Sequence, residues 1–372
     1  MDRGFALTIE GSSLGVHRSI DPVAVLPRAA WRLDNRPQLW PNEARLHVEI
    51  LALDPVVFRR LRANAAGDPG RLRAGVLETV AERGKLQDPT SGGGGSLLGT
   101  VSDVGPDHPR DLPLGARVAL PAALGLTPLW LADVAGWDGA TALVPARGHA
   151  IIFPSSPLAC LPDDLETRLA LSLIELAPIV GVVTRRVGPG DRVAVLGGGH
   201  AAGAFASVAA RERGAAGVLS VVTNWQEVCL VEALGAATPA VADLRDPLST
   251  AAAVREGLEG LCDLAVVCDG AKGVEAGALL AIRPGGTAVF AASPLTCADL
   301  ADAARSLSCD VELVIAGGQV SGSAEVACEL LATYPRLRTI VSEESSLAPG
   351  SPAPVADRGD AARGGGRAGR RA

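Results

Sequence analysis

Apolar and polar residues follow one pattern up to about residue 165 and a different pattern after it. Over 44–53 polar and apolar side chains alternate, which is the period of a half-buried strand. One or two helices are expected over 56–83, and strand patterns return over 97–105 and 114–120 and continue towards residue 165. The first part of the chain is therefore predicted to be a β-rich domain, entered through an irregular stretch over 1–45.

From residue 165 onwards, helices and strands alternate. A helix is expected over 165–186, because the acidic residues after Pro162 favour a first helical turn. Strands separated by helices imply a parallel, doubly wound sheet, so the predicted fold class is α/β. The expected strands are 193–196, 217–222, 264–268, 287–292 and 311–316, and the expected helices between and after them are 201–213, 225–234, 273–281, 298–306 and 322–333.

The first of these strands runs directly into the glycine-rich turn GGGHAAG over 197–203. Gly197, Gly199 and Ala202 fit the permissive G-x-G-x-x-G/A fingerprint of a Rossmann unit, and Gly203 adds a small residue one position later. In such a turn the N-terminus of the following helix faces the pyrophosphate of a dinucleotide. Because the turn follows the first strand of the predicted parallel sheet, we expect a dinucleotide to bind here.

Four further residues are expected near this cofactor. Thr223 and Asn224 follow the second strand, where NAD-selective Rossmann units commonly carry an acid that holds the ribose hydroxyls. Neither that acid nor an arginine for a 2′-phosphate is in place, so the residues alone leave NAD and NADP open. Asp269 follows another strand and is expected to line the cofactor site. His200 either contacts the phosphates or is only the polar residue that starts the helix, and the second interpretation is favoured.

Length and composition support two domains. The chain has 372 residues and is 48% hydrophobic, which is enough for two cores. We expect a β-rich domain over 1–165 and a Rossmann domain over 166–341. Residues 342–372 are expected to form a disordered tail, because their few apolar residues cannot offset the entropy lost on ordering.

Charge and cysteine usage exclude several classes of partner. The net charge is −7 and the concentrated basic run is confined to 363–371, which argues against nucleic-acid binding. No stretch approaches the roughly 20 uninterrupted apolar residues of a membrane span. The N-terminus lacks an apolar signal core, and the seven cysteines form no C-x-x-C pair. We therefore expect a cytoplasmic protein with neither a nucleic-acid nor a membrane partner.

The same chain resembles known families. The stretch LGTVSDVG over 98–105, together with GDRVAVLGGG over 190–199, resembles the medium-chain dehydrogenase/reductase architecture, in which a β-rich GroES-like domain precedes a Rossmann domain. More narrowly, the resemblance is to the L-erythro-3,5-diaminohexanoate dehydrogenase family. That family usually has Asn at the position of Asp88 and Ser at that of Gly93. The segments that carry it are GVHR at 15–18, LP at 26–27, AWRLDN at 30–35, AERGK at 81–85 and the glycine-rich stretch at 88–99.

This resemblance implies an activity, a cofactor and an assembly. The family oxidises the 3-amino group of 3,5-diaminohexanoate, a small diamino acid of lysine fermentation, to a ketone with NAD and releases ammonia. Members of the superfamily commonly dimerise through the nucleotide domain, so a homo-oligomer is expected. Two alternatives stay open, namely a zinc-free reductase of enones or quinones and a non-catalytic NAD(P)-binding regulatory protein.

Candidate catalytic residues follow from a comparison with the zinc-dependent members of that superfamily. The positions of their three catalytic ligands fall here near Asp54, at Gly95 and within 172–175, so the ligand set is missing and no metal is expected. Carboxylates remain at two of these places, Asp54 and Glu175. Oxidative deamination needs a base that takes a proton from the substrate ammonium and later from water. We predict this role for Asp54 or Glu175, with a turn cap before Pro55 as the alternative for Asp54.

Two cations lie just before the glycine run at 92–95. Arg83 and Lys85 flank Gly84 and are predicted to bind the substrate carboxylate, Arg83 as a bidentate partner and Lys85 as a point charge. The alternative is that both are solvated cations at a helix end. His17 and Arg32 belong to the same resembling segments and are further candidates.

Overall fold

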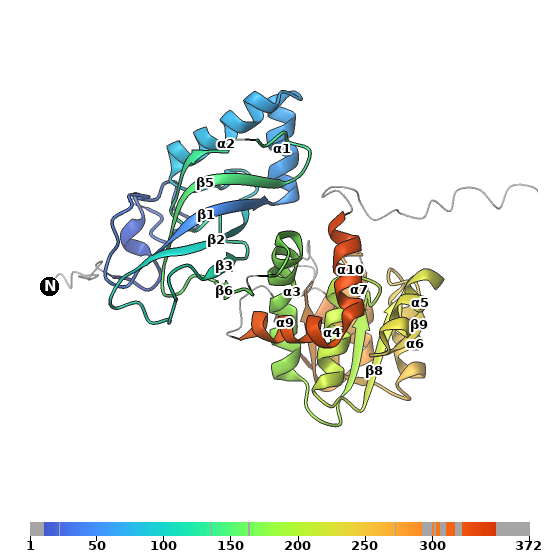
Figure 1. Cartoon of the computed structure of the whole chain (residues 1–372). Coiled ribbons are helices and arrows are strands. Elements are labelled where there is room, and N and C mark those ends of the chain that lie inside the picture. The colour runs from blue at the N-terminus through green and yellow to red at the C-terminus, as the bar shows by residue number, and fades with distance from the viewer. Residues whose placement is uncertain are drawn as a thin grey trace, which may run out of the picture.

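The chain folds into two lobes joined by a long central helix (Figure 1). The computed structural model describes residues 11–21, 23–134, 136–162, 164–271, 273–291, 300, 303–305, 310–316 and 322–346. The first lobe is built on an antiparallel sheet and the second on a parallel sheet with helices on both faces. This arrangement confirms the predicted α/β class with a β-rich first domain and a Rossmann second domain.

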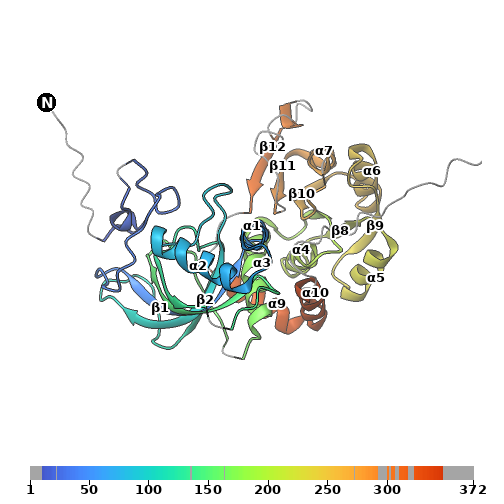
Figure 2. The ribbon, with the colours of Figure 1, turned by 90° about the horizontal axis from the view of Figure 1, so that it is seen from above.

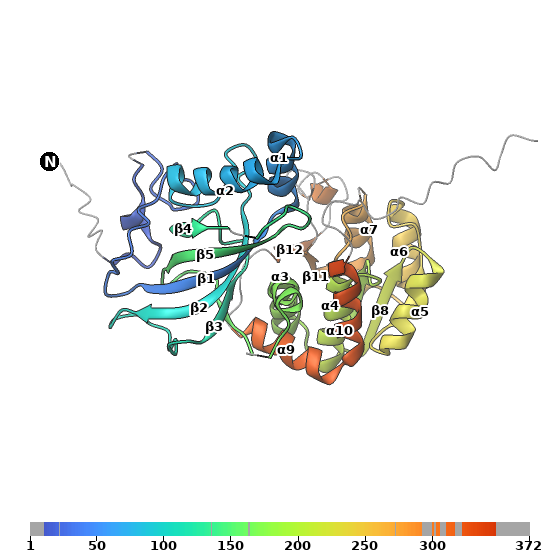
Figure 3. The same cartoon turned by 45° about the horizontal axis from the view of Figure 1, so that its top comes forward.

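The sheet of the first lobe has the strand order β4-β5-β1-β2-β3-β6. Two helices, α1 (Pro55–Ala65) and α2 (Pro69–Arg83), follow β1 and lie together over this lobe (Figure 3). Each begins with an aspartate cap and a proline in its first turn, an arrangement that satisfies free helix amides. The strands are β1 (Ala44–Leu53), β2 (Gly95–Val104), β3 (Arg117–Leu120), β4 (Leu129–Asp133), β5 (Leu143–Ile152) and β6 (Ala159–Cys160).

The sheet of the second lobe has the order β12-β11-β10-β7-β8-β9, and its strands are parallel. From β7 the chain adds β8 and β9 towards one edge of the sheet. It then returns to the middle, where β10 pairs with the other side of β7, and adds β11 and β12 towards the opposite edge. The topology therefore switches between β7 and β10. Ligands of doubly wound sheets bind beyond the carboxyl ends of the strands at such a point. The strands are β7 (Arg192–Leu196), β8 (Gly217–Val222), β9 (Thr238–Val241), β10 (Cys262–Val267), β11 (Ile282–Phe290) and β12 (Val311–Ile315).

Helices cover both faces of this sheet because alternate strand residues point to opposite faces. Val193 and Val195 of β7 join a core with α3, α4, α9 and α10, whereas Ala194 and Leu196 join a second core with α6 and α7. Figure 2 shows the two helix layers from above. The helices are α3 (Thr167–Arg186), α4 (Ala201–Glu212), α5 (Trp225–Leu234), α6 (Pro247–Gly257), α7 (Val274–Ala281), α9 (Ser323–Thr333) and α10 (Pro335–Ser346).

Helix α3 joins the two lobes and belongs to the protein core. Its length and apolar composition would fit a membrane span, but 61% of its most apolar window is buried inside the protein. Burial of this kind is typical of a core helix. The helix begins after Glu166, whose carboxylate accepts hydrogen bonds from the amides of Arg168 and Leu169.

The predicted elements differ from the structure mainly near the C-terminus. Helix α10 continues to Ser346, so residues 342–346, which were expected in a disordered tail, are helical instead. The rest of that tail, 347–372, and most of the helix expected over 298–306 lie outside the described residues. Strand β9 and helices α6 and α10 were not predicted.

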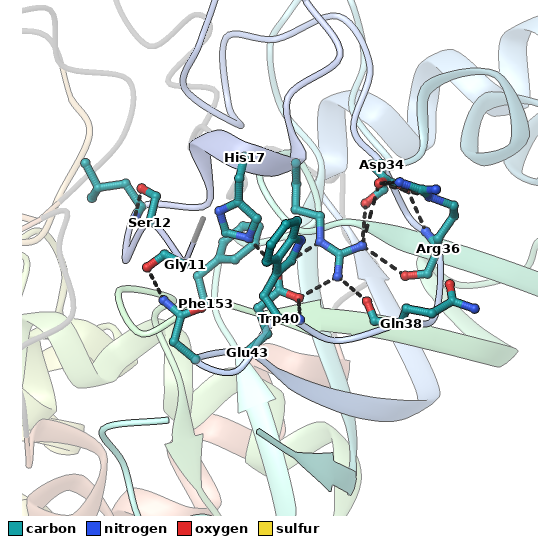
Figure 4. A network of polar contacts seen from close by, with 12 residues as sticks. Gly11, Ser12, His17, Asp34, Arg36, Gln38, Trp40, Glu43 and Phe153 are labelled. Atoms are coloured by element: carbon teal, nitrogen blue, oxygen red, sulfur yellow. Dashed lines mark hydrogen bonds and ion pairs between the residues drawn. The ribbon is translucent and has the colours of Figure 1, made fainter. Parts of the chain in front are cut away.

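A buried network of charges attaches the N-terminal segment to the first sheet. Arg18, at the end of the short 3-10 helix η1 (Val16–Arg18), donates from Nε and Nη2 to the two carboxylate oxygens of Glu43, at 2.8 and 2.5 Å. His17 and Glu43 point toward each other, with 2.8 Å between Nε2 and Oε1 (Figure 4). Arg18 is 1% exposed and Glu43 is fully buried. Burial raises the pKa of Glu43, but the hydrogen bonds from Arg18 and His17 outweigh it and hold that pKa below its ordinary value.

We expect Glu43→Gln to reduce the free energy of unfolding by about 3 kcal/mol, because it removes the carboxylate that binds the buried Arg18 guanidinium at 2.5 and 2.8 Å and leaves the more distant Asp34, at 4.0 Å. Wild-type stability should also fall as the pH drops below the ordinary Glu pKa and through the lowered pKa of Glu43. Urea unfolding at several pH values measures both effects. The control is Glu49→Gln, on the exposed side of β1, which should change stability by less than about 0.5 kcal/mol. Equal stability of the two variants would contradict the role given to Glu43.

Candidate functional site

The glycine turn lies at the switch point of the parallel sheet, between the ends of β7 and β10. Gly197 follows β7 with a φ of 90°, which favours glycine, and a Cβ placed on it would lie 2.9 Å from the backbone nitrogen and Cβ of Asp269. Asp269 follows β10, and its carboxylate accepts a hydrogen bond from the Ala271 amide at 2.6 Å. The structure thus brings Gly197 and Asp269 together where a doubly wound sheet binds its ligand.

The close contact between α4 and the turn is made by Gly203. A Cβ on Gly203 would meet the backbone of Gly197 and Gly198, which is the packing required of the third glycine in a dinucleotide fingerprint. The prediction gave this position to Ala202. Gly197 keeps the first position, so Gly197 and Gly203 lie six residues apart, one more than the fingerprint specifies.

An acid does lie at the end of β8, although it comes from the first turn of α5. The Glu227 carboxylate accepts hydrogen bonds from the Thr223 amide at 2.7 Å and from Asn224 Nδ2 at 2.8 Å, and the Asn224 side chain caps α5 through the Glu227 amide. A Cβ on Gly199 would collide with the Glu227 side chain. The spacing Asn-x-x-Glu is that of a capping box and was the signal that sequence reasoning missed.

His200 is surrounded by carboxylates at the start of α4. Its Nδ1 lies 3.7 Å from Glu344 Oε1 and its Nε2 lies 3.9 Å from Asp269 Oδ2. The nearby Glu344 carboxylate, with the charges of Glu227 and Asp269, raises the pKa of His200 against the opposing effect of its partial burial. The same Glu344 oxygen accepts a hydrogen bond from the Ala201 amide at 2.7 Å, so a carboxylate from α10 lies at the N-terminus of α4.

Glu175 lies on α3, where this helix faces the first lobe. Its carboxylate Oε1 is 3.4 Å from the hydroxyl of Ser96 at the start of β2. Ser96 is buried, and its oxygen also accepts a hydrogen bond at 3.1 Å from the amide of Ala122, which has a left-handed φ of 47°. The Ser96 hydroxyl thus accepts from the Ala122 amide and donates to Glu175.

Asp54 is the second carboxylate of this group. Its Oδ1 accepts a hydrogen bond from the Val56 amide at 2.7 Å and caps α1, as the alternative interpretation expected, while its negative charge acts on Glu175. The Glu175 side chain is exposed to solvent, although the protein atoms around it partly desolvate its carboxylate. This desolvation raises the pKa of Glu175, the Ser96 hydrogen bond lowers it, and repulsion from Asp54 raises it further. A carboxylate with a raised pKa is suited to proton transfer near neutral pH.

The glycine run that precedes Ser96 packs closely against its surroundings. A Cβ on Gly94 would lie 2.6 Å from the Leu86 carbonyl oxygen, and one on Gly95, where φ is 131°, would collide with the Ala52 carbonyl. The Asp54 amide also donates to the Gly94 carbonyl at 3.1 Å. These glycines are thus required because the backbone comes close to the end of β1, and they place Ser96 beside Asp54 and Glu175.

Arg83 and Lys85 lie away from these carboxylates and face the N-terminal segment. The Lys85 ammonium is fully buried and donates to the carbonyls of Pro27, Arg28 and Gly125 at 2.8, 3.1 and 3.1 Å. Desolvation lowers the pKa of Lys85 to about 8. These contacts occupy all three ammonium hydrogens, so the structure gives Lys85 a packing role in place of the predicted contact with a substrate carboxylate.

Arg83 has a similar environment. Its guanidinium stacks 4.4 Å from the ring centre of Trp31 and donates to the Trp31 carbonyl and to the carbonyl and side chain of Gln87. Burial lowers the pKa of Arg83. Arg83 therefore binds the N-terminal segment as well, and its contact with a substrate carboxylate stays a prediction. His17 is likewise part of the buried Glu43 network. Arg32 is exposed.

Within the described part of the chain, no group of three or more His, Cys, Asp or Glu side chains could hold a metal ion. The residues that could hold a dinucleotide are those at the switch point, namely the turn over 197–203 with Asp269 and Glu227. The residues that could transfer a proton are Glu175 and Asp54.

The fold is that of the medium-chain dehydrogenases/reductases, a class of proteins with two domains. A solved structure of the quinone oxidoreductase from Coxiella burnetii has the same fold, with a TM-score of 0.50 and 16% sequence identity over 87% of this chain and 93% of that one.

Within this class, the chain belongs to the L-erythro-3,5-diaminohexanoate dehydrogenase family. The model of this family's N-terminal domain matches residues 17–162. The L-erythro-3,5-diaminohexanoate dehydrogenase of Acetoanaerobium sticklandii is 31% identical over 89% of this chain and 98% of the relative, and that of Fusobacterium nucleatum is 31% identical over 90% and 99%. These relatives confirm the resemblance carried by the segments around 15–18 and 81–99.

We expect Lys85→Met to destabilise the protein by about 2 kcal/mol, because three buried carbonyls lose their donor. Thermal unfolding measures this change. The control is Arg59→Met on the exposed side of α1, which should remain within about 0.5 kcal/mol of wild type. A Lys85→Met protein with wild-type stability would contradict the packing role of Lys85.

Proposed function

We propose that this protein catalyses the NAD-dependent oxidative deamination of L-erythro-3,5-diaminohexanoate to 5-amino-3-oxohexanoate, with release of ammonia. The observation that carries the proposal is the pair of carboxylates, Glu175 and Asp54, at the junction of the lobes. Glu175 has a raised pKa and a directed hydrogen bond from Ser96. The names of the two curated relatives support the same substrate and reaction class.

The cofactor proposed is NAD. The turn over 197–203 fits a dinucleotide, because Gly203 allows α4 to pack on the turn and the first amides of α4 point to the switch point. Glu227 at the end of β8 supports NAD, because a carboxylate at this position would accept hydrogen bonds from the ribose hydroxyls and would repel a 2′-phosphate. When bound, NAD supplies the acceptor for the hydride that leaves C3 of the substrate.

The residues of the chain then account for the proton transfers. The Glu175 carboxylate takes one proton from the ammonium group on C3, which frees the nitrogen lone pair that assists departure of the hydride. Loss of the hydride leaves an iminium group at C3. Glu175, free again after passing its proton to solvent, takes a proton from the water that adds to C3 and gives it to the nitrogen of the resulting carbinolamine. The C–N bond then breaks, the nitrogen leaves as ammonia, and the carbinolamine hydroxyl passes its proton to Glu175 as the ketone forms. Ser96 holds the carboxylate in one orientation through both steps.

The electrostatics of the site also favour this substrate. 3,5-Diaminohexanoate carries two ammonium groups and one carboxylate near neutral pH, so two carboxylates at the junction attract its cationic part. Asp54 contributes charge without giving up its cap on α1. A cytoplasmic location and a homo-oligomeric assembly remain predictions that accompany this proposal.

The experiment that tests the proposal is a spectrophotometric assay of NAD reduction with 3,5-diaminohexanoate, with ammonia measured in parallel. We expect one ammonia for each NADH and a preference for NAD over NADP. Other amines, simple alcohols, and enones or quinones with NADH or NADPH serve as comparison substrates. Absence of turnover with every amine would refute the proposal, and reduction of an enone or quinone in its place would support the reductase alternative.

We expect Glu175→Gln to lower kcat by about 10³-fold, since it removes the general base. Its thermal stability should equal or exceed that of the wild type, because a carboxylate with a raised pKa is disfavoured by the fold. The matched control is Glu325→Gln, an exposed acid on α9, which should retain full turnover. A Glu175→Gln enzyme with near-normal kcat would exclude Glu175 as the base.

Two further variants should shift the pH dependence in opposite directions. Activity requires ionised Glu175 and should rise with pH through its pKa. Asp54→Asn removes the repulsion while an amide oxygen still caps α1, so the rise in kcat/KM should move to lower pH. Ser96→Ala removes the hydrogen bond, so the rise should move to higher pH. Shifts in the same direction, or none, would contradict this electrostatic coupling, and complete loss of activity in Asp54→Asn would point to Asp54 as the base.

A further inference from the structure

The start of helix α4 is contacted by an acid from the far end of the chain. Glu344 lies on α10, and its Oε1 accepts a hydrogen bond from the Ala201 amide at 2.7 Å across 143 residues of sequence. Helix α10 lies beside α4 in two views (Figures 1 and 3) and packs on α3, α4 and α9. The contact is thus made by a helix that belongs to the core of the second lobe.

Glu344 lies against two groups at the pyrophosphate end of the proposed dinucleotide site. The first amide of α4 is one of the free donors that attract an anion to a helix N-terminus. His200, which has no side-chain hydrogen bond to cap the helix, is the second group and lies 3.7 Å from the same oxygen. An anion that binds at this turn therefore meets a carboxylate already in place.

The negative charges around the Glu344–Ala201 contact would repel a bound phosphate. Asp269 and Glu227 also act on His200, so Glu344 adds a third negative charge around the turn. Two anions compete for the same amide and the same imidazole, and the like charges repel each other when both are present.

We propose that Glu344 is an internal occupant of the pyrophosphate site, and that the dinucleotide binds only when it displaces this side chain from Ala201 and His200. The proposal rests on the NAD site described under the proposed function. It makes α10 an autoinhibitory element that lowers the affinity for the cofactor and protects the amides of α4 when no cofactor is bound.

The test is calorimetric titration of the full-length protein with NAD, and with ADP-ribose, which lacks the nicotinamide ring. Glu344→Ala should bind both ligands about tenfold more tightly than wild type, which corresponds to about 1.4 kcal/mol. Glu344→Gln keeps the shape of the side chain but removes its charge, so its affinities should fall between the two. The apoprotein of Glu344→Ala should melt at a lower temperature than wild type and gain more stability from NAD.

The matched control is Glu343→Ala, which removes the same charge from an exposed position one residue away on α10 and should bind NAD as wild type does. Affinities of Glu344→Ala that equal those of wild type, or are weaker, would overturn the proposal, and so would an equal gain in Glu343→Ala. If wild type and all variants fail to bind NAD, the cofactor assignment itself fails and this proposal falls with it. A Glu344→Ala protein that does not fold leaves the decision to Glu344→Gln.

Discussion

The amides at the N-terminus of α4 are the interaction on which the ligand site of the second lobe depends. A helix that begins at the switch point of a parallel sheet carries free donors and partial positive charge into the ligand site. Gly197 and Gly203 let the turn and the helix approach closely enough to present these donors. Four titratable side chains lie within reach of the turn and surround this partial positive charge. They are His200, Glu227, Asp269 and Glu344.

The contact between α3 and the first lobe meets a different requirement. It holds the Glu175 carboxylate in a fixed orientation while its pKa is raised. Desolvation by the surrounding protein disfavours the charge of Glu175, and Asp54 adds repulsion. Ser96 supplies the compensating hydrogen bond, and its own orientation depends on the left-handed backbone of Ala122. The close-packed glycines at the start of β2 matter for chemistry because they fix the position of Ser96.

The sequence predicted the elements that carry a strong periodic signal and missed contacts that depend on the tertiary fold. Strand 217–222 and helix 225–234 were predicted with their observed bounds, because turn residues delimit them on both sides. The prediction gave the third position of the fingerprint to Ala202, whereas the close contact with the backbone of Gly197 is made by Gly203, and only the tertiary structure shows this contact. Glu344 could not have been found, because no local pattern relates it to a helix 143 residues earlier.

The segments that identify the family act mainly through structure. Trp31 stacks on Arg83, the carbonyls of Pro27 and Arg28 bind Lys85, and Arg18 pairs with Glu43. A buried cation without carboxylate hydrogen bonds, such as Lys85, is costly unless carbonyl dipoles surround it, so the N-terminal segment and Lys85 require each other. A distinctive motif therefore marks the family reliably, while the proton transfers that we propose are assigned to Glu175, with Asp54 and Ser96 beside it, where this fold brings α3 to the first sheet.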